Sequence, residues 1–237
     1  NYQYIKKALI KDYYNLVFKS DSDTEVLVNA IELWGIDKTI EKCIGMFAFA
    51  VYLIKEEKII LARDRFGEKP LYYGVQNGLL GFSSELKALK LLNKVGWKFD
   101  IDRNSLATYM LHGYIPTPPS IYKHISKLNV GSYVVFDNGG NNKETKYWDS
   151  KIVLDTHKYT DTYDNALITL EDKLKNTLFM QMQSDVPLGA FLSGGIDSTT
   201  IVALMQSMSN EKINTFSIGF DQKKYNEAEH ARAVANH

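Results

Sequence analysis

Residues 188 to 198 read Leu-Gly-Ala-Phe-Leu-Ser-Gly-Gly-Ile-Asp-Ser. The apolar run 188–192 predicts a buried strand, and Asp197-Ser198 open an amphipathic segment that predicts a helix. Between them, Gly194-Gly195 let backbone N–H groups approach phosphate oxygens without interference from a Cβ atom, and a helix N-terminus adds partial positive charge. The stretch therefore predicts a strand, a phosphate-binding loop and a helix.

Asp197 has two interpretations. A carboxylate beside phosphates repels them unless a cation lies between, so its functional role would be to hold Mg²⁺, while Ser193 and Ser198 add hydroxyl donors. Alternatively, Asp197 or Ser198 caps the helix, and Gly194-Gly195 form an ordinary turn. The chain contains neither G-x-x-x-x-G-K-[ST] nor G-x-G-x-x-G, which excludes a Walker loop and a Rossmann fingerprint.

The surrounding pattern alternates between strands and helices. Residues 163–182 place leucines three or four positions apart, which predicts a core-facing helix. Residues 198–208 and 226–236 predict further helices, and residues 213–218 a second strand. This alternation implies a parallel sheet, whose ligand is expected at the carboxyl ends of the strands, where Leu192 and Ile218 fall.

The first part of the chain follows a different pattern. Residues 23–34 predict a helix that begins with a capping box, Ser22-x-x-Glu25. Strand pairs are expected at 46–53 with 58–62, at 70–75 with 79–83 around Asn77-Gly78, and at 132–136 with 144–148. A short helix is expected at 105–112. The pattern alone indicates an α+β domain at 1–150, a polar linker at 149–162, and a second domain at 160–237.

Several motifs resemble known enzymes. S-G-G-x-D-S at 193–198 is similar to the loop of the N-type ATP pyrophosphatases, which cleave ATP between its α and β phosphates. The segments 45–50, 62–74 and 83–87 resemble the glutaminase domain of glutamine-hydrolysing asparagine synthetases, and Gly113-Tyr114-Ile115-Pro116 and Lys127-Leu128-x-x-Gly131 continue the match. The resemblance covers nearly the whole chain, in order.

This resemblance implies a four-layer αββα fold of the N-terminal nucleophile hydrolase type, truncated, followed by a truncated parallel-sheet α/β ATP pyrophosphatase domain. It also implies a C–N ligase that hydrolyses glutamine, passes the ammonia internally, and adenylates aspartate with ATP and Mg²⁺ to make asparagine. Two alternatives remain open. One is a relative that uses another carboxylate, such as a sugar acid or a β-lactam precursor, and the other is an inactive binding module.

The resemblance also assigns roles to residues. It places Asp23 on the α-amino group of glutamine, where a carboxylate suits an ammonium; the alternative is helix capping, which Ser22 already accounts for. Leu192 and Ile218 would contact adenine through their backbones, or would simply pack in a core. Gly219 leaves room for the nucleotide. The expected ATP site therefore comprises Leu192, Ser193, Gly194, Gly195, Asp197, Ser198, Ile218 and Gly219, with Mg²⁺ on Asp197.

The beginning of the chain predicts a fragment. Asn1-Tyr2-Gln3 resembles the end of a family motif, N-G-E-I-Y-N, so the nucleophilic Cys is expected upstream of Asn1, and a later S-G-E-G-x-D-E loop after His237. Cys43 is interpreted as a buried, inert thiol, so the fragment alone should not hydrolyse glutamine. Arg63-Asp64-Arg65 is interpreted as a charged run that closes a hairpin, with no catalytic role.

Charge and composition limit the kinds of partner that the protein is expected to bind. Lys plus Arg and Asp plus Glu both number 28, so no basic field favours nucleic acid or an anionic membrane. The longest apolar run, 46–54, is far below the ~20 residues of a membrane helix. The only cysteine is Cys43, which fits a reducing compartment. We expect a cytoplasmic protein that acts on glutamine, aspartate and ATP, with a homodimer as one open assembly.

Overall fold

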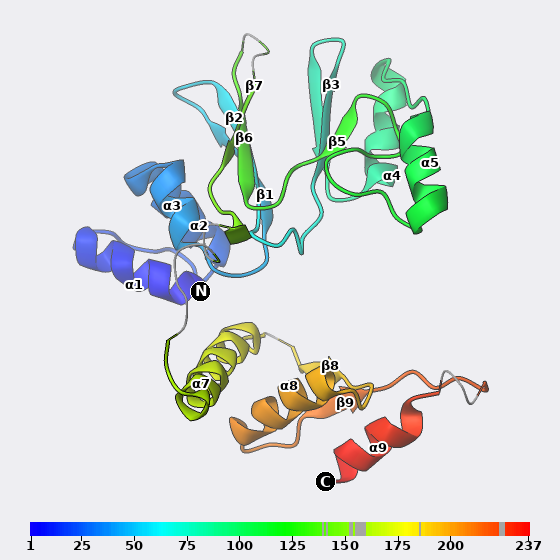
Figure 1. The fold of residues 1–237 in the computed structure, drawn as a ribbon. Coiled ribbons are helices and arrows are strands. Elements are labelled where there is room, and N and C mark those ends of the chain that lie inside the picture. The colour runs from blue at the N-terminus through cyan, green and yellow to red at the C-terminus, as the bar shows by residue number, and fades with distance from the viewer. Residues whose placement is uncertain (139, 141, 152–153, 155–159, 185, 223–225) are drawn as a thin grey trace. The chain divides into compact units, whose positions relative to one another are not determined.

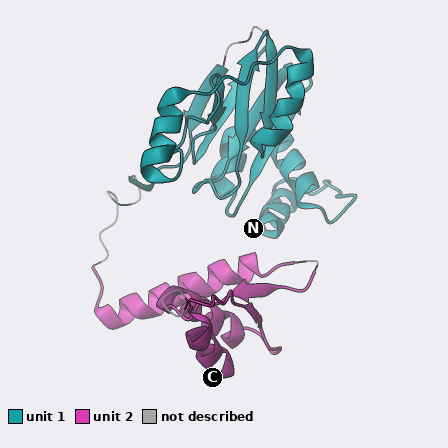
Figure 2. Cartoon of the chain, turned by 90° about the vertical axis from the view of Figure 1, so that its right-hand side faces the viewer, with its two compact units in different colours: residues 1–157 teal, residues 158–237 magenta. Residues whose placement is uncertain are grey.

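The computed structural model describes residues 1–138, 140, 142–151, 154, 160–184, 186–222 and 226–237. The chain divides into two compact units, residues 1–157 and 158–237, which Figure 2 colours separately. The predicted linker at 149–162 includes residues 152–153 and 155–159, which lie outside the described residues.

Unit 1 contains two antiparallel sheets with helices outside each of them (Figure 1). One sheet has the order β1-β2-β6-β7 and the other β4-β3-β5. The strands are β1 Ala48–Leu53, β2 Lys58–Arg63, β3 Tyr72–Gln76, β4 Leu79–Ser83, β5 Ile125–Lys127, β6 Ser132–Phe136 and β7 Asn142–Lys146. The helices are α1 Tyr2–Asp12, α2 Asp23–Trp34, α3 Ile36–Lys42, α4 Leu86–Leu89, the 3-10 helix η1 Lys90–Val95 and α5 Arg103–His112.

The side chains of β2 show how the layers arise. Ile60 and Ala62 pack with Ile40 of α3, whereas Leu61 packs with Leu71 and residues of the second sheet. Successive side chains of a strand point to opposite faces, so the first sheet packs on both sides at β2. Helices cover one side, and the second sheet covers the other.

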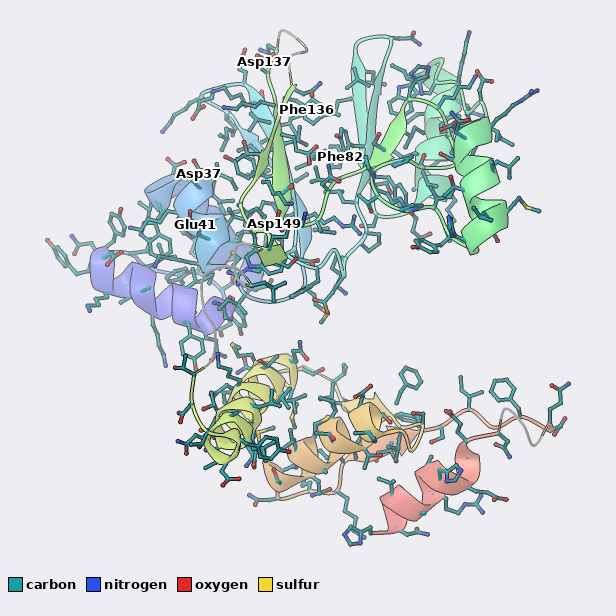
Figure 3. All side chains as sticks on the ribbon, in the orientation of Figure 1. Asp37, Glu41, Phe82, Phe136, Asp137 and Asp149 are labelled. Carbon is teal, nitrogen blue, oxygen red and sulfur yellow. The ribbon has the colours of Figure 1, made fainter. Side chains whose placement is uncertain are left out.

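The second sheet also packs against other residues on both faces. On its inner face, the ring of Tyr73 on β3 meets that of Phe136 on β6 edge-on, with centroids 5.8 Å apart (Phe136 is labelled in Figure 3). On its outer face, Leu89, Trp97 and Ile125 form a separate core with α4 and η1. Helices, sheet, sheet and helices therefore follow one another, which is the predicted αββα arrangement.

The predicted hairpins are present. Gln76 pairs with Leu79, so Asn77 and Gly78 form a two-residue loop, and both have positive φ, 54° and 74°. This is the pattern of a type I′ turn. The strand predicted at 144–148 ends earlier, at Lys146, because Tyr147 and the next residue both donate their N–H groups to the carbonyl of Gly131 instead of extending the ladder.

The interpretation of Arg63-Asp64-Arg65 as the closure of a hairpin is wrong. The β1–β2 hairpin closes at 54–57, whereas Asp64 follows β2 and is completely buried. Its carboxylate accepts hydrogen bonds from four backbone N–H groups at 2.9 to 3.3 Å, those of Phe47, Phe66, Glu68 and Lys69. A buried carboxylate is stable only when its oxygens are satisfied in this way.

Arg63 completes this buried arrangement. Its guanidinium donates to the carbonyls of Gly67, Lys69 and Leu128 at 2.7 to 2.9 Å. The two neighbouring side chains thus fix the loop 64–70 from both sides, one through N–H groups and the other through carbonyl oxygens. Arg63 and Asp64 are thus buried, whereas Arg65 is half-buried and its guanidinium donates to the carbonyl of Glu41 at 3.0 Å.

The helix predicted at 23–34 is confirmed, but its capping box is only partly formed. The Ser22 hydroxyl accepts from the N–H of Thr24, as a cap should. Glu25 does not reach back to Ser22; its carboxylate accepts from the N–H groups of Lys19 and Ser20 at 2.7 Å. These contacts lower the pKa of Glu25 and fold the preceding loop onto the helix.

Unit 2 contains α7 Tyr163–Gln181, β8 Gly189–Phe191, α8 Ile196–Ser207, β9 Asn214–Phe216 and α9 Ala228–Asn236. Strands β8 and β9 are parallel, as predicted, and Leu192, Val202 and Ala231 form the core between them and the helices α8 and α9. The helix predicted at 163–182 is confirmed, but its apolar stripe is only partly buried within this unit. Leu178 is buried, but Leu167 and Leu170 are 47% and 54% exposed. Across the described ranges, every helix is too short or too polar to span a bilayer.

Candidate functional site

The loop 193–195 leaves the sheet of unit 2 at the carboxyl ends of both strands. Phe191 pairs with Phe216, and the N–H of Leu192 donates to the carbonyl of Phe216 at 2.8 Å. The chain then turns at Ser193 into α8, while Ile218 follows β9 at the same edge. In open parallel sheets this edge is where ligands bind.

The two glycines of the loop differ. Gly194 has φ +82°, and a Cβ there would come within 2.6 Å of the Cβ of His230 and 2.8 Å of the N of Ala231, so the chain itself requires glycine. Gly195 is extended (φ −72°), and a Cβ would meet only the Ser193 hydroxyl at 3.4 Å, an ordinary contact. Nothing in the described fold demands glycine at 195. Its missing Cβ leaves open space at the helix entry.

The N-terminus of α8 has no side-chain cap. Gly195 is the N-cap residue, and no side chain accepts from the first turn. The alternative in which Asp197 or Ser198 caps this helix is therefore wrong. Asp197 is instead the second helical residue, it is exposed, and its carboxylate has no hydrogen-bond or ion-pair partner among the described residues. First-turn N–H groups lack intrahelical acceptors, so this end favours an anion.

Two serine hydroxyls hold the loop in shape. Ser193 and Ser198 bring their Oγ atoms to 3.0 Å. The Ser198 hydroxyl accepts from the N–H of Ser193, and the Ser193 hydroxyl accepts from the N–H of Gly195, each at 3.3 Å. Both hydroxyls therefore lie on the loop side of α8, next to the open position of Gly195.

Leu192 and Ile218, paired by the sequence analysis, have different environments. Leu192 is 2% exposed and packs in the core, whereas Ile218 is 69% exposed, so core packing is wrong for Ile218. The backbone N–H and carbonyl of Ile218 have no partner within the described part of the chain. Next to it, a Cβ at Gly219 would meet Ala228 and Asn226 only at 3.7 Å. The backbone here is accessible from outside.

Ser217 joins the two strand ends, which the sequence did not reveal. Its hydroxyl donates to the carbonyl of Leu192 at 2.6 Å. The backbone of Leu192 is thereby held through its N–H by the last residue of β9 and through its carbonyl by the residue that follows β9. A serine directly after a strand gives no local signal of such a contact, because its acceptor is 25 residues away.

This edge fits a nucleotide with a divalent cation. It offers open space at Gly195, uncapped helix N–H groups, and one unpaired carboxylate on Asp197. Mg²⁺ is commonly held by one or two carboxylates together with phosphate oxygens, so a single Asp suffices. Within the described ranges no group of three or more His, Cys, Asp or Glu residues converges.

A second candidate site surrounds Asp23 in unit 1. Asp23 is exposed in the first turn of α2, beside the cap residue Ser22. Asn1 is fixed by three hydrogen bonds to the segment 42–44, including one from its backbone nitrogen to the carbonyl of Ile44 at 3.1 Å. Asn1, Cys43 and Asp23 lie within electrostatic reach of one another, so the three residues lie in one region.

Cys43 is buried, as predicted. Its removal from water raises the pKa of the thiol to about 11. At neutral pH the group is protonated, and a thiol is a much weaker nucleophile than a thiolate. The geometry supports a packing role, with Ile5, Leu9 and Val26 in the same core cluster.

Two family models match the chain. That of the glutamine amidotransferase domain covers residues 1–148, and that of asparagine synthase covers residues 169–237. The first thus matches most of unit 1, and the second includes α8 and its loop. The two matches do not overlap.

Curated relatives match over both units. A putative glutamine-hydrolysing asparagine synthetase 2 of Methanocaldococcus jannaschii is 34% identical over 240 residues, covering 100% of this chain and 44% of the relative. Asparagine synthetase 1 of Bacillus subtilis, also named glutamine-hydrolysing, is 32% identical over 99% of this chain and 36% of its own length. The chain thus spans less than half of these relatives.

Among solved structures, a glutamine phosphoribosylpyrophosphate amidotransferase of B. subtilis aligns with a TM-score of 0.42 and 16% identity, covering 93% of this chain and 44% of that structure. An allosteric regulatory enzyme of purine biosynthesis aligns with a TM-score of 0.45 and 15% identity, over 94% and 43%. The family assignment comes from the sequence: since the first model matches more than half of the residues, the chain belongs to the glutamine amidotransferase domain family.

Proposed function

We propose that this chain belongs to a glutamine-dependent asparagine synthetase, a ligase that makes asparagine from aspartate, ATP and ammonia released from glutamine. In this proposal the glutaminase domain is 1–150 and the ATP-dependent domain begins at 160. The names of both curated relatives and the asparagine synthase match support the assignment. The expected setting is the cytoplasm.

The observation that carries the proposal is the uncapped start of α8. An exposed helix N-terminus, a glycine that the fold does not require and an unpaired carboxylate meet at the carboxyl edge of a parallel sheet. A plain structural turn would need none of the three. Together they suit a polyphosphate whose negative charge is shared with a cation.

Each residue of the proposed ATP site has a physical task. The N–H groups at the start of α8, with Ser193, Gly194, Gly195 and Ser198 around them, would bind phosphate oxygens, and Asp197 would hold the cation. Leu192, Ile218 and Gly219 would border the base. When bound, Mg²⁺ supplies charge neutralisation for the departing pyrophosphate. The free backbone groups of Ile218 can orient a purine edge without any side chain.

The proposal makes a direct prediction for the full-length protein. Pyrophosphate release from ATP should depend on aspartate, because a free carboxylate is a poor electrophile until adenylation gives it a leaving group. A coupled pyrophosphate assay with aspartate, glutamate and succinate measures this. Equal release with another carboxylate would reject aspartate as the acceptor, while release without any carboxylate would reject the ligase assignment.

Asp23 offers a second prediction, for the glutaminase half. Replacing Asp23 with Asn should raise the KM for glutamine at least about tenfold with a smaller change in kcat, because the ion pair with the ammonium is lost. Measurement of glutamate release at varied glutamine gives both constants.

The matched control is Ser22→Ala. It removes the helix cap and should lower the free energy of unfolding by about 1 kcal/mol without changing the KM for glutamine. If Asp23→Asn leaves the KM unchanged, or if both variants change it equally, the ammonium contact is wrong and the residue serves the helix alone.

A further inference from the structure

A cavity of about 380 Å³ lies in unit 1 between the second sheet and α5, in the outer helical layer. Its walls come from β3, β5, α4 and the loop that follows α5. The two motifs Gly113-Tyr114-Ile115-Pro116 and Lys127-Leu128-x-x-Gly131, which the proposed function leaves without a role, meet here: Gly113, Tyr114, Ile115 and Lys127 all line it. Its volume is within the range of small-molecule sites.

The only charge among the residues that line the cavity is positive. Lys127 is the only charged residue among those that line it, and no carboxylate within the described residues forms an ion pair with it. Its ammonium donates to the carbonyl of Ile115, which leaves two of its three protons free. Burial lowers the pKa of Lys127, and nearby Arg63 lowers it further. A half-buried cation next to another cation attracts an anion.

The remaining walls suit a flat apolar body. Tyr72 lies on β3 beside Lys127, with which it pairs in the sheet, and Tyr109 and Tyr114 are the more exposed residues on the α5 side. None of the three hydroxyls has a hydrogen bond within the described part of the chain. Leu86 and Ile121 add aliphatic surface. Aromatic walls with free hydroxyls favour a ring with a polar group at one end.

We propose that this cavity binds a small planar carboxylate, with its anionic group on Lys127 and its ring between the tyrosines. The residues that line the site all belong to unit 1, and Asp23 is not among them. It would therefore be independent of the proposed glutamine and ATP sites.

The test uses isothermal titration calorimetry of the full-length protein with indole-3-acetate and its neutral isostere indole-3-acetamide. We expect the acetate to bind with a submillimolar Kd and the acetamide at least roughly tenfold more weakly, because only the carboxylate forms an ion pair with the ammonium of Lys127. Saturating glutamine or ATP should leave the acetate Kd unchanged. Lack of binding, equal affinities, or displacement by either substrate would overturn the proposal.

Substitutions of residues that line the cavity test whether the acetate binds there. Lys127→Met should weaken the acetate at least roughly tenfold and leave the acetamide unaffected, whereas Lys123→Met, four residues earlier and exposed, should change neither. Tyr109→Ala, at a half-exposed helical position, should weaken both ligands. If Lys127→Met fails to fold, Tyr109→Ala tests the location of the site by itself. Unchanged acetate binding in Tyr109→Ala, or in a folded Lys127→Met protein, contradicts the proposed binding site.

Discussion

Replacing Asp197 with Ala should reduce aspartate-dependent pyrophosphate release by at least about 100-fold in the full-length protein, while glutaminase activity stays measurable. In the proposed site Asp197 provides a carboxylate for the cation, and charge stabilisation by a bound metal is worth several kcal/mol in the transition state. Parallel assays of pyrophosphate and of glutamate release separate the two halves.

Asp164 provides the matched control. Like Asp197, it is an exposed aspartate in the first turn of a helix of unit 2, so Asp164→Ala removes the same favourable interaction with a helix dipole. It should leave pyrophosphate release within about twofold. Equal losses of pyrophosphate release in the two variants would mean that Asp197 only stabilises its helix. Full activity in Asp197→Ala would mean that Asp197 is not part of the ATP site.

The largest effect on stability is expected at Asp64. Substitution by Ala leaves four backbone N–H groups without an acceptor in the interior and should lower the free energy of unfolding by about 3 to 5 kcal/mol. Urea denaturation followed by circular dichroism measures the change.

Glu68→Ala is the comparison for Asp64. Glu68 lies in the same loop and donates its backbone N–H to Asp64, but its side chain is exposed. Its removal should change the free energy of unfolding by no more than about 0.5 kcal/mol. A loss below about 1 kcal/mol in Asp64→Ala would mean that water replaces the carboxylate and that the loop is not held as described.

Local signals predicted well those elements that local chemistry determines. Asn77-Gly78 specify a tight turn because both residues tolerate positive φ, and Ser22 marks the start of α2 because its hydroxyl satisfies a nearby N–H. The strand, loop and helix at 189–207 were likewise predictable, since the apolar run, the glycines and the amphipathic segment follow one another without interruption.

Elements that depend on distant partners were missed. In α1 only Ile5 and Leu9 are buried, and the helix has no side-chain cap to mark its start. β5 is three residues long and exists through its pairing with Tyr72 to Gly74. Conversely, the regular spacing of the leucines in α7 predicted that they are buried, but Leu167 and Leu170 are exposed in unit 2. The spacing of apolar residues indicates an apolar helix face but does not show what covers that face.

The features of the candidate sites also divide into those that local sequence predicts and those that depend on distant residues. The roles proposed for Gly195 and Asp197 followed from residue type and spacing, and the geometry excluded the capping alternative. Burial of Asp64, the bond from Ser217 to Leu192, and the convergence of two motifs on one cavity required the tertiary fold. Polar residues that act across long sequence separations carry no local pattern.

The free main chain at Ile218 has an evolutionary consequence. If base selectivity resides in one peptide unit, as proposed, then the side chain at 218 can drift to any residue of suitable bulk while the choice of purine persists. Selectivity would change instead through substitutions that re-aim the peptide, such as loss of the Ser217 hydroxyl that ties the adjoining strand ends. A comparison of side chains alone would therefore miss the determinant of base selectivity, which lies in main-chain atoms in this proposal.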